Sequence, residues 1–181
     1  MKRREKTMKK NKGFSLVELI IVIAIMAILA AAIAPALIRY IDKSRRADDV
    51  TAAGTINSSM TAALANEDIY DEIFKVSAGN VVMAANEGAA TWTINSTVGG
   101  TELSKEMNSS CPPPKIKYKK AIEAADTYTG KAFTPGGWAV AVSKEGKPVV
   151  FICASGVSAN AGAITGVSGV QLQPSIDKAY K

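Results

Sequence analysis

The sequence has no histidine, only two cysteines and few aromatic residues, which make up 6% of its 181 positions. Without histidine it has neither imidazole for acid–base catalysis nor the ligand of many zinc sites. It also lacks a phosphate-binding glycine motif with its lysine. The carboxylates at residues 67–72 are better explained as a solvated helix end than as a cation site. These absences predict a protein that is not an enzyme and holds no cofactor or metal.

The positive charge is confined to the first residues of the chain. Residues 1–13 carry seven Lys/Arg and one Glu, which accounts for the whole formal charge of +6. The remaining residues contain fifteen Lys/Arg and fifteen Asp/Glu and are neutral. A nucleic-acid surface is therefore not indicated, and the basic block is better interpreted as a leader segment.

A run of 20 uncharged, mostly apolar residues extends from Leu19 to Ile38. A signal peptide has an apolar region of about 7 to 15 residues, whereas roughly 20 residues span a bilayer as a helix. The run contains an A-x-A pattern at residues 32–34, but Pro35 would directly follow a cut there. Its length therefore favours a membrane-spanning helix over a removable signal peptide.

The distribution of cations predicts the orientation of this span. Seven Lys/Arg precede the apolar run, and four follow it closely at positions 39, 43, 45 and 46. The positive-inside rule then keeps the N-terminus in the cytoplasm and places the rest of the chain outside.

Glu18 lies just inside the apolar segment, where a carboxylate is costly. It either marks the interface or has a cationic partner. A cut after Gly13 would create an amine on Phe14, four residues before Glu18 and on the same helical face. In the same or a neighbouring chain, that amine would relieve the cost of burying the carboxylate.

Residues 12–18, KGFSLVE, resemble the processing motif of type IV prepilins and of the related pseudopilins. The resemblance implies that a prepilin peptidase cuts between Gly13 and Phe14 and methylates Phe14. It also implies that Glu18 promotes assembly by complementing the N-terminal amine of a neighbouring subunit. Pro35 matches a proline that many type IV pilins have in their first helix. The implied partners are the peptidase/methyltransferase, other copies of the chain and other pilins, the membrane before assembly, and the pilus assembly machinery.

Beyond the membrane the helical pattern becomes amphipathic, with apolar residues recurring three or four positions apart. These are Val50, Ala53, Ile56, Met60, Ala63 and Leu64. We expect a helix from Phe14 to about Leu64, and we assign residues 39–74 to its amphipathic continuation. The whole chain divides into a leader (1–13), an apolar helix (14–38), this continuation, and an extracellular β-rich region (75–181).

The last region contains short strand signals at 81–85, 91–95 and 115–120. The firmest prediction is a hairpin of 138–142 and 149–153, with Trp138, Val140 and Val142 on the face that covers the helix. Residues 154–169 form either a surface loop or a weak edge strand. The predicted fold class is α+β, a type IV pilin-like long helix packed on a small antiparallel sheet.

Cys111 and Cys153 are the only cysteines, and the predicted topology puts them on the more oxidising side of the membrane. Two alternatives remain open: a disulfide, which would stabilise the domain by roughly 4 kcal/mol, or two buried thiols.

The resemblance predicts a structural subunit of a pilus-like surface filament, in the membrane as a precursor and at the cell surface after assembly. A pseudopilin of type II secretion or DNA uptake is the alternative within the family. Major pseudopilins of type II secretion often bind calcium in their C-terminal loops, and Asp177 is the only acid after Cys153. A membrane-anchored binding domain that never polymerises is the alternative from another class.

Overall fold

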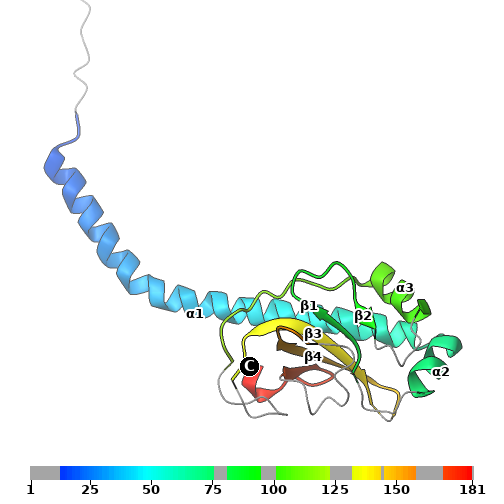
Figure 1. Cartoon of the computed structure of the whole chain (residues 1–181). Coiled ribbons are helices and arrows are strands. Elements are labelled where there is room, and N and C mark those ends of the chain that lie inside the picture. Colours follow the sequence, from blue (N-terminus) through cyan, green and yellow to red (C-terminus); the bar gives the residue numbers. More distant parts are fainter. Residues whose placement is uncertain are drawn as a thin grey trace, which may run out of the picture. The chain divides into compact units, whose positions relative to one another are not determined.

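The computed structural model describes residues 13–75, 81–94, 101–122, 132–143, 145–157 and 169–180 (Figure 1). Residues 1–12 of the predicted leader lie outside this range. The chain divides into two compact units, Met1–Ile41 and Asp42–Lys181. Helix α1, Leu16–Ala63, contributes to both units.

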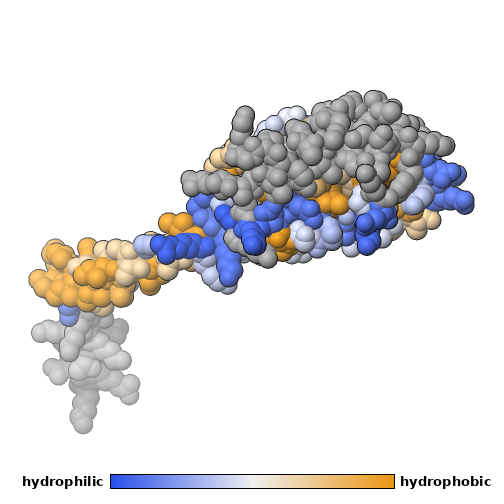
Figure 2. Space-filling model, turned by 90° about the horizontal axis from the view of Figure 1, so that it is seen from below, coloured by the Kyte–Doolittle hydropathy of each residue, from blue (hydrophilic) through white to orange (hydrophobic). Residues whose placement is uncertain are grey.

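In the first unit, every described side chain of α1 is exposed. Large aliphatic residues follow one another on all sides of the helix, and Figure 2 shows this stretch in orange. Pro35 lies inside the helix and cannot donate a backbone hydrogen bond to the preceding turn. No described residue of this unit buries that apolar surface.

In the second unit, α1 is amphipathic as predicted. Ala53, Ile56, Met60 and Ala63 are buried, and Val50 and Leu64 pack at the margin of the same core. The apolar stripe of α1 in this unit therefore forms part of the core.

The amphipathic segment predicted over residues 39–74 consists of two helices, not one. Helix α1 ends at Ala63, and a separate helix, α2, runs from Glu67 to Lys75. Between them, Asn66 accepts a hydrogen bond on its side-chain oxygen from the backbone N–H of Asp68, at 3.0 Å. Asn66 thus acts as an N-cap, which starts a new helix instead of continuing the old one.

The sheet is antiparallel, with strand order β2-β1-β3-β4-β5. Its strands are β1 (Val81–Asn86), β2 (Thr93–Ile94), β3 (Pro135–Val142), β4 (Pro148–Ala154) and β5 (Gly169–Gln173). Helix α3, Thr101–Ser110, follows β2. The predicted hairpin is confirmed, and β3 and β4 are longer than expected because pairing extends past Trp138 to Pro135.

Three other expectations about strands meet different outcomes. The strand expected at 91–95 is reduced to Thr93–Ile94, and residue 95 lies outside the described residues. Most of the segment 154–169 also lies outside them, whereas β5, starting at Gly169, was not anticipated. The strand expected at 115–120 is wrong, because this segment pairs with α1 instead of the sheet.

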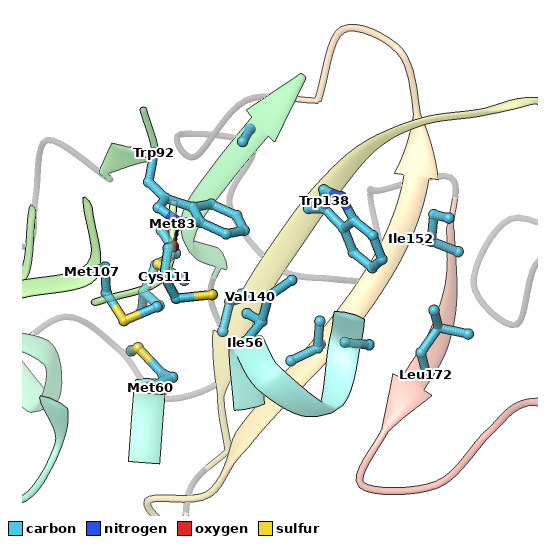
Figure 3. Close-up of a cluster of buried hydrophobic side chains, with 14 of the residues drawn as sticks. Ile56, Met60, Met83, Trp92, Met107, Cys111, Trp138, Val140, Ile152 and Leu172 are labelled. Carbon is cyan, nitrogen blue, oxygen red and sulfur yellow. Dashed lines mark hydrogen bonds between the residues drawn. The ribbon is translucent and has the colours of Figure 1, made fainter. Parts of the chain in front are cut away.

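The core occupies the face of the sheet that packs against α1 (Figure 3). Trp138, Val140 and Val142 of β3 belong to the same apolar cluster as Ile56 and Met60 of α1, as predicted. The alternate residues Ala139 and Ala141 form a second cluster on the other face, with Phe151 and Cys153 of β4.

Two tryptophans attach the chain after α3 to this core. The indole N–H of Trp92 donates to the carbonyl of Cys111 at 2.7 Å, and that of Trp138 donates to the carbonyl of Pro114 at 2.8 Å. Both rings are buried. The segment that follows Pro114 is thereby directed along α1.

The carboxylate of Asp49 on α1 holds that segment in place. Asp49 is fully buried, and its two oxygens accept hydrogen bonds from the backbone N–H groups of Lys117 and Tyr118, at 2.8 and 2.9 Å. The hydroxyl of Tyr180, in the 3-10 helix Lys178–Tyr180, donates to the same carboxylate at 2.7 Å. Because these amide groups bond to Asp49, they are not available to a sheet, which explains the missing strand.

Arg46, one turn before Asp49, completes the cluster. It donates to the Tyr118 hydroxyl at 2.7 Å, and its guanidinium carbon lies 4.3 Å from the centroid of that ring. The Tyr118 and Tyr180 rings meet edge to face at 6.0 Å. Three segments far apart in the sequence, on α1, before residue 120 and at the C-terminus, are therefore joined through one buried charge.

Tyr180→Phe tests this cluster, because it removes one donor and leaves the other two in place. A hydrogen bond to a charged group contributes about 1.5–3 kcal/mol, so we expect the free energy of unfolding to fall by about that amount at neutral pH. Urea unfolding of the full chain in detergent, followed by fluorescence of the buried tryptophans, measures it. Tyr40→Phe removes a hydroxyl from an exposed ring and should change nothing.

The wild-type protein and Tyr180→Phe should also differ in how their stability depends on pH in alkaline solution. Burial raises the pKa of Tyr180 above its ordinary value of about 10, and the hydrogen bond to Asp49 raises it further. Above about pH 10 the unfolded state loses this proton while the folded state keeps it, so stability falls as the pH rises. Tyr180→Phe should lower that slope by up to about 1.4 kcal/mol per pH unit. Identical slopes would show that Tyr180 is not held by Asp49.

Candidate processing and assembly site

The residues around the predicted cut precede the first turn of α1. Gly13 is exposed, and no described atom lies within 4 Å of the position that a Cβ would take there. Phe14 is 85% exposed. Residues 13–15 have no regular secondary structure, and the helix begins at Leu16. The peptide bond between Gly13 and Phe14 therefore lies in a non-helical stretch whose described neighbours leave it accessible.

Glu18 lies in the first turn of α1 and has a partner that the sequence analysis did not anticipate. Its side chain accepts a hydrogen bond from the backbone N–H of Ser15, at 2.9 Å. Ser15 is at the N-cap position, since its carbonyl accepts from the N–H of Leu19 at 3.2 Å. This is the carboxylate half of an S-x-x-E capping box, a signal present in the sequence at residues 15–18.

The cap reduces the cost of placing a charge here without removing it. The N-terminus of a helix carries partial positive charge, which favours a carboxylate in the first turn. One oxygen of Glu18 accepts the bond from Ser15, and the other has no hydrogen-bond partner among the described residues. The carboxylate can therefore still accept a bond from a group outside this chain.

The apolar surface that follows Glu18 is continuous. The described part of the chain contains one helix, α1, that is long and apolar enough to cross a membrane. No residue of its apolar stretch is buried. Pro35 lies 17 residues after Glu18, or about 26 Å along an α-helix. The structure therefore does not bring Pro35 to the predicted cut, and Gly13, Phe14 and Glu18 form a separate group at the start of the helix.

These features describe an α+β protein whose exposed apolar helix begins shortly after an accessible glycine and is long enough to cross a membrane. A family model described as the prokaryotic N-terminal methylation motif matches residues 8–34. The match contains Gly13, Phe14 and Glu18 and ends one residue before Pro35. No solved structure matches this chain.

This match at the N-terminus supports a protein of the type IV prepilin and pseudopilin family. The motif implies processing by a prepilin peptidase and assembly with other pilins. Members of the family are structural proteins and not normally enzymes. The motif and the apolar helix together support a precursor anchored in the membrane.

The two cysteines do not form a disulfide in this structure. Cys111 belongs to the apolar cluster shared with α1, and Cys153 belongs to the cluster on the opposite face of the sheet. Burial raises the pKa of the Cys111 thiol, and a hydrogen bond with Ser59 offsets part of that rise. Of the two alternatives that the sequence left open, the structure contains the buried thiols.

Alkylation of the unfolded protein tests this assignment. With denaturant and no reducing agent, iodoacetamide should modify both Cys111 and Cys153, since neither sulfur is joined to the other. Intact-mass spectrometry counts the adducts, and Cys153→Ser serves as the one-thiol standard. A wild-type protein that accepts label only after reduction would contradict the arrangement of the two sulfurs described above.

Proposed function

We propose that this chain is the structural subunit of a type IV pilus-like surface filament. In this proposal, prepilin peptidase cuts between Gly13 and Phe14, Phe14 is methylated, and the mature chain polymerises through α1. The observation that carries it is the exposed apolar half of α1, most of which lies within the N-terminal methylation motif.

The two halves of α1 support this function through their different burial. The second half packs on the sheet, whereas the side chains of the first half are exposed over more than six turns. An apolar helix of that length needs lipid or other apolar helices around it. The membrane surrounds it in the precursor, and copies of the same helix surround it in a filament.

Small residues in the first half suit the second environment. Between Ala27 and Ala36 most side chains are alanine, which allows the backbones of neighbouring helices to approach closely. Pro35 removes one hydrogen bond from this part of α1. We infer that this region adjusts its conformation when the helix leaves the membrane and packs among its copies.

Glu18 has a distinct role at each stage in this proposal. In the single chain its carboxylate caps the first turn through Ser15. In the filament its second oxygen accepts a charge-assisted bond from the methylated amine of Phe14 in a neighbouring copy. That amine is the cationic partner that the carboxylate needs in apolar surroundings.

The cleavage step is tested by Gly13→Val. A branched side chain restricts the backbone that the peptidase must bind, so the variant should remain as the full precursor in the membrane. Mass spectrometry of the N-terminal peptide should find methylated Phe14 in the wild type and Met1 or Lys2 in the variant. Mature N-termini in both proteins would show that Gly13 is not the processing site.

The charge on Glu18 is tested with two variants that separate it from capping. Glu18→Gln keeps an oxygen that can cap Ser15 but removes the charge, whereas Glu18→Ala removes both. Breaking a buried ion pair costs about 3–5 kcal/mol, so each variant should lower the yield of sheared filaments by roughly a hundredfold or more. Cleavage at Gly13 should be unchanged in both.

The two variants also show whether assembly depends on the ion pair or on the cap. If Glu18→Gln assembles normally while Glu18→Ala does not, the cap is what matters and the ion pair is refuted. If the wild-type chain forms no filaments but stays as a mature monomer in the membrane, it is an anchored domain and not a pilus subunit.

A further inference from the structure

Exposed cations gather where residues 115–120 lie against α1. Ile116 and Tyr118 are buried, so the intervening lysines are directed outward. Two exposed cations of α1 flank the helical face that this segment contacts. We call this group of six the basic patch, and its members are Lys43, Arg45, Lys115, Lys117, Lys119 and Lys120.

The basic patch is held on a fixed frame. Asp49 binds the backbone of residues 117 and 118, while Lys120 pairs with Asp42, the first residue of the second unit. Lys119 pairs with Glu87. The side chains of Lys43, Arg45, Lys115 and Lys117 have no ion pair among the described residues. Two of these four positive charges lie on α1, and the other two lie on the segment that is hydrogen-bonded to α1.

Exposed carboxylates lie at the other end of the same half of α1. Helix α2 starts four residues after α1 ends, and Figure 1 shows it at that end of the second unit. Glu67, Asp68 and Asp71 are exposed and have no ion pair among the described residues. We call these three residues the acidic patch. From Asp49 to the end of α1 is 14 residues, or about 21 Å, so the two patches cannot neutralise one another within one chain.

The charges of the two ends are opposite and similar in size. Residues 42–49 and 115–120 contain seven Lys/Arg and three Asp/Glu, whereas residues 67–75 contain four acids and one lysine. The chain after Gly13 is neutral overall. A membrane of anionic lipid would attract the basic patch, but it would leave the acidic patch without a counterpart. A second copy of this chain supplies a counterpart for both.

We propose that the basic patch of one subunit docks on the acidic patch of another in a head-to-tail contact. The inference rests on the proposed filament function and adds a specific contact between globular domains to it. Because the two surfaces differ, the contact is heterologous, and repeating it gives an open helical assembly instead of a closed dimer. Complementary charge also orients the incoming copy, since like ends repel.

Zero-length carbodiimide cross-linking of filaments from the mature full chain tests the contact. The reagent joins a lysine amine to a carboxylate only where the two meet. We expect links from Lys115 or Lys117 to residues of the acidic patch. Filaments assembled from mixed light and heavy isotope-labelled chains should give mixed-mass linked peptides, which shows that the link joins two copies.

Charge exchange provides the second arm of the test. Lys115→Glu with Lys117→Glu should lower filament yield by about tenfold or more, because carboxylates would then face carboxylates. Glu67→Lys with Asp71→Lys should do the same from the other side. All four changes together should restore the yield. The control is Lys147→Glu, which makes the same type of reversal at a single site in the exposed turn between β3 and β4 and should assemble normally.

The outcomes separate this inference from the function on which it rests. If wild-type filaments lack these cross-links and neither pair of reversals lowers the filament yield, the head-to-tail contact is refuted. The proposed filament function would still stand. A different pair of results would assign the basic patch to the membrane. In that case the lysine reversals would assemble normally, and the wild-type lysines would be protected from an amine reagent only in anionic vesicles. A wild-type chain that forms no filament would remove the proposed function itself.

Discussion

A single buried carboxylate, that of Asp49, determines how the domain is assembled around α1. A charge with no exposure to water needs donors on every side, because burying it unpaired would cost several kcal/mol. Two of its donors are backbone N–H groups of a segment whose sequence predicts a strand, and the third is the hydroxyl of Tyr180 next to the C-terminus. The helix, that segment and the end of the chain therefore fit together in one register. The outward lysines of the basic patch take their positions from the same constraint.

The long helix serves two environments, and the boundary between them follows from which residues it can bury. In the second unit, α1 has one apolar stripe, which the sheet covers. In the first unit, α1 is apolar on all sides and no described residue covers it. Lipid and a bundle of identical helices are both able to accept such a surface, so the same segment suits both the membrane-anchored precursor and the filament that we propose. The cost of Glu18 at its start is reduced because the backbone N–H of Ser15 donates to its carboxylate.

The arrangement of charges in the residues after Gly13 becomes apparent only when these residues are placed on the fold. In sequence, the lysines at 115–120 resemble an alternating strand, and the acids at 67–72 resemble a solvated helix end. The fold places the first group beside the start of the second unit and the second group at the far end of α1. A neutral chain thereby gains two oppositely charged ends, which is the property that a head-to-tail assembly requires.

The sequence by itself determined the local and periodic features. A run of 20 apolar residues after a basic leader, the motif at residues 12–18, the stripe from Val50 to Leu64 and the hairpin around residues 143–147 each depend on neighbours in the chain, so their residues predict them. The capping box at Ser15 was visible in the same way but was missed. Tertiary structure alone decided that the backbone of residues 117 and 118 binds Asp49, that Asn66 begins a new helix, and that the cysteines lie on opposite faces. The first and the last of these outcomes depend on partners tens of residues away, whose pairing no local pattern encodes. The new helix at Asn66 depends on whether the chain continues α1 or caps α2. The packing of each helix decides between these two conformations.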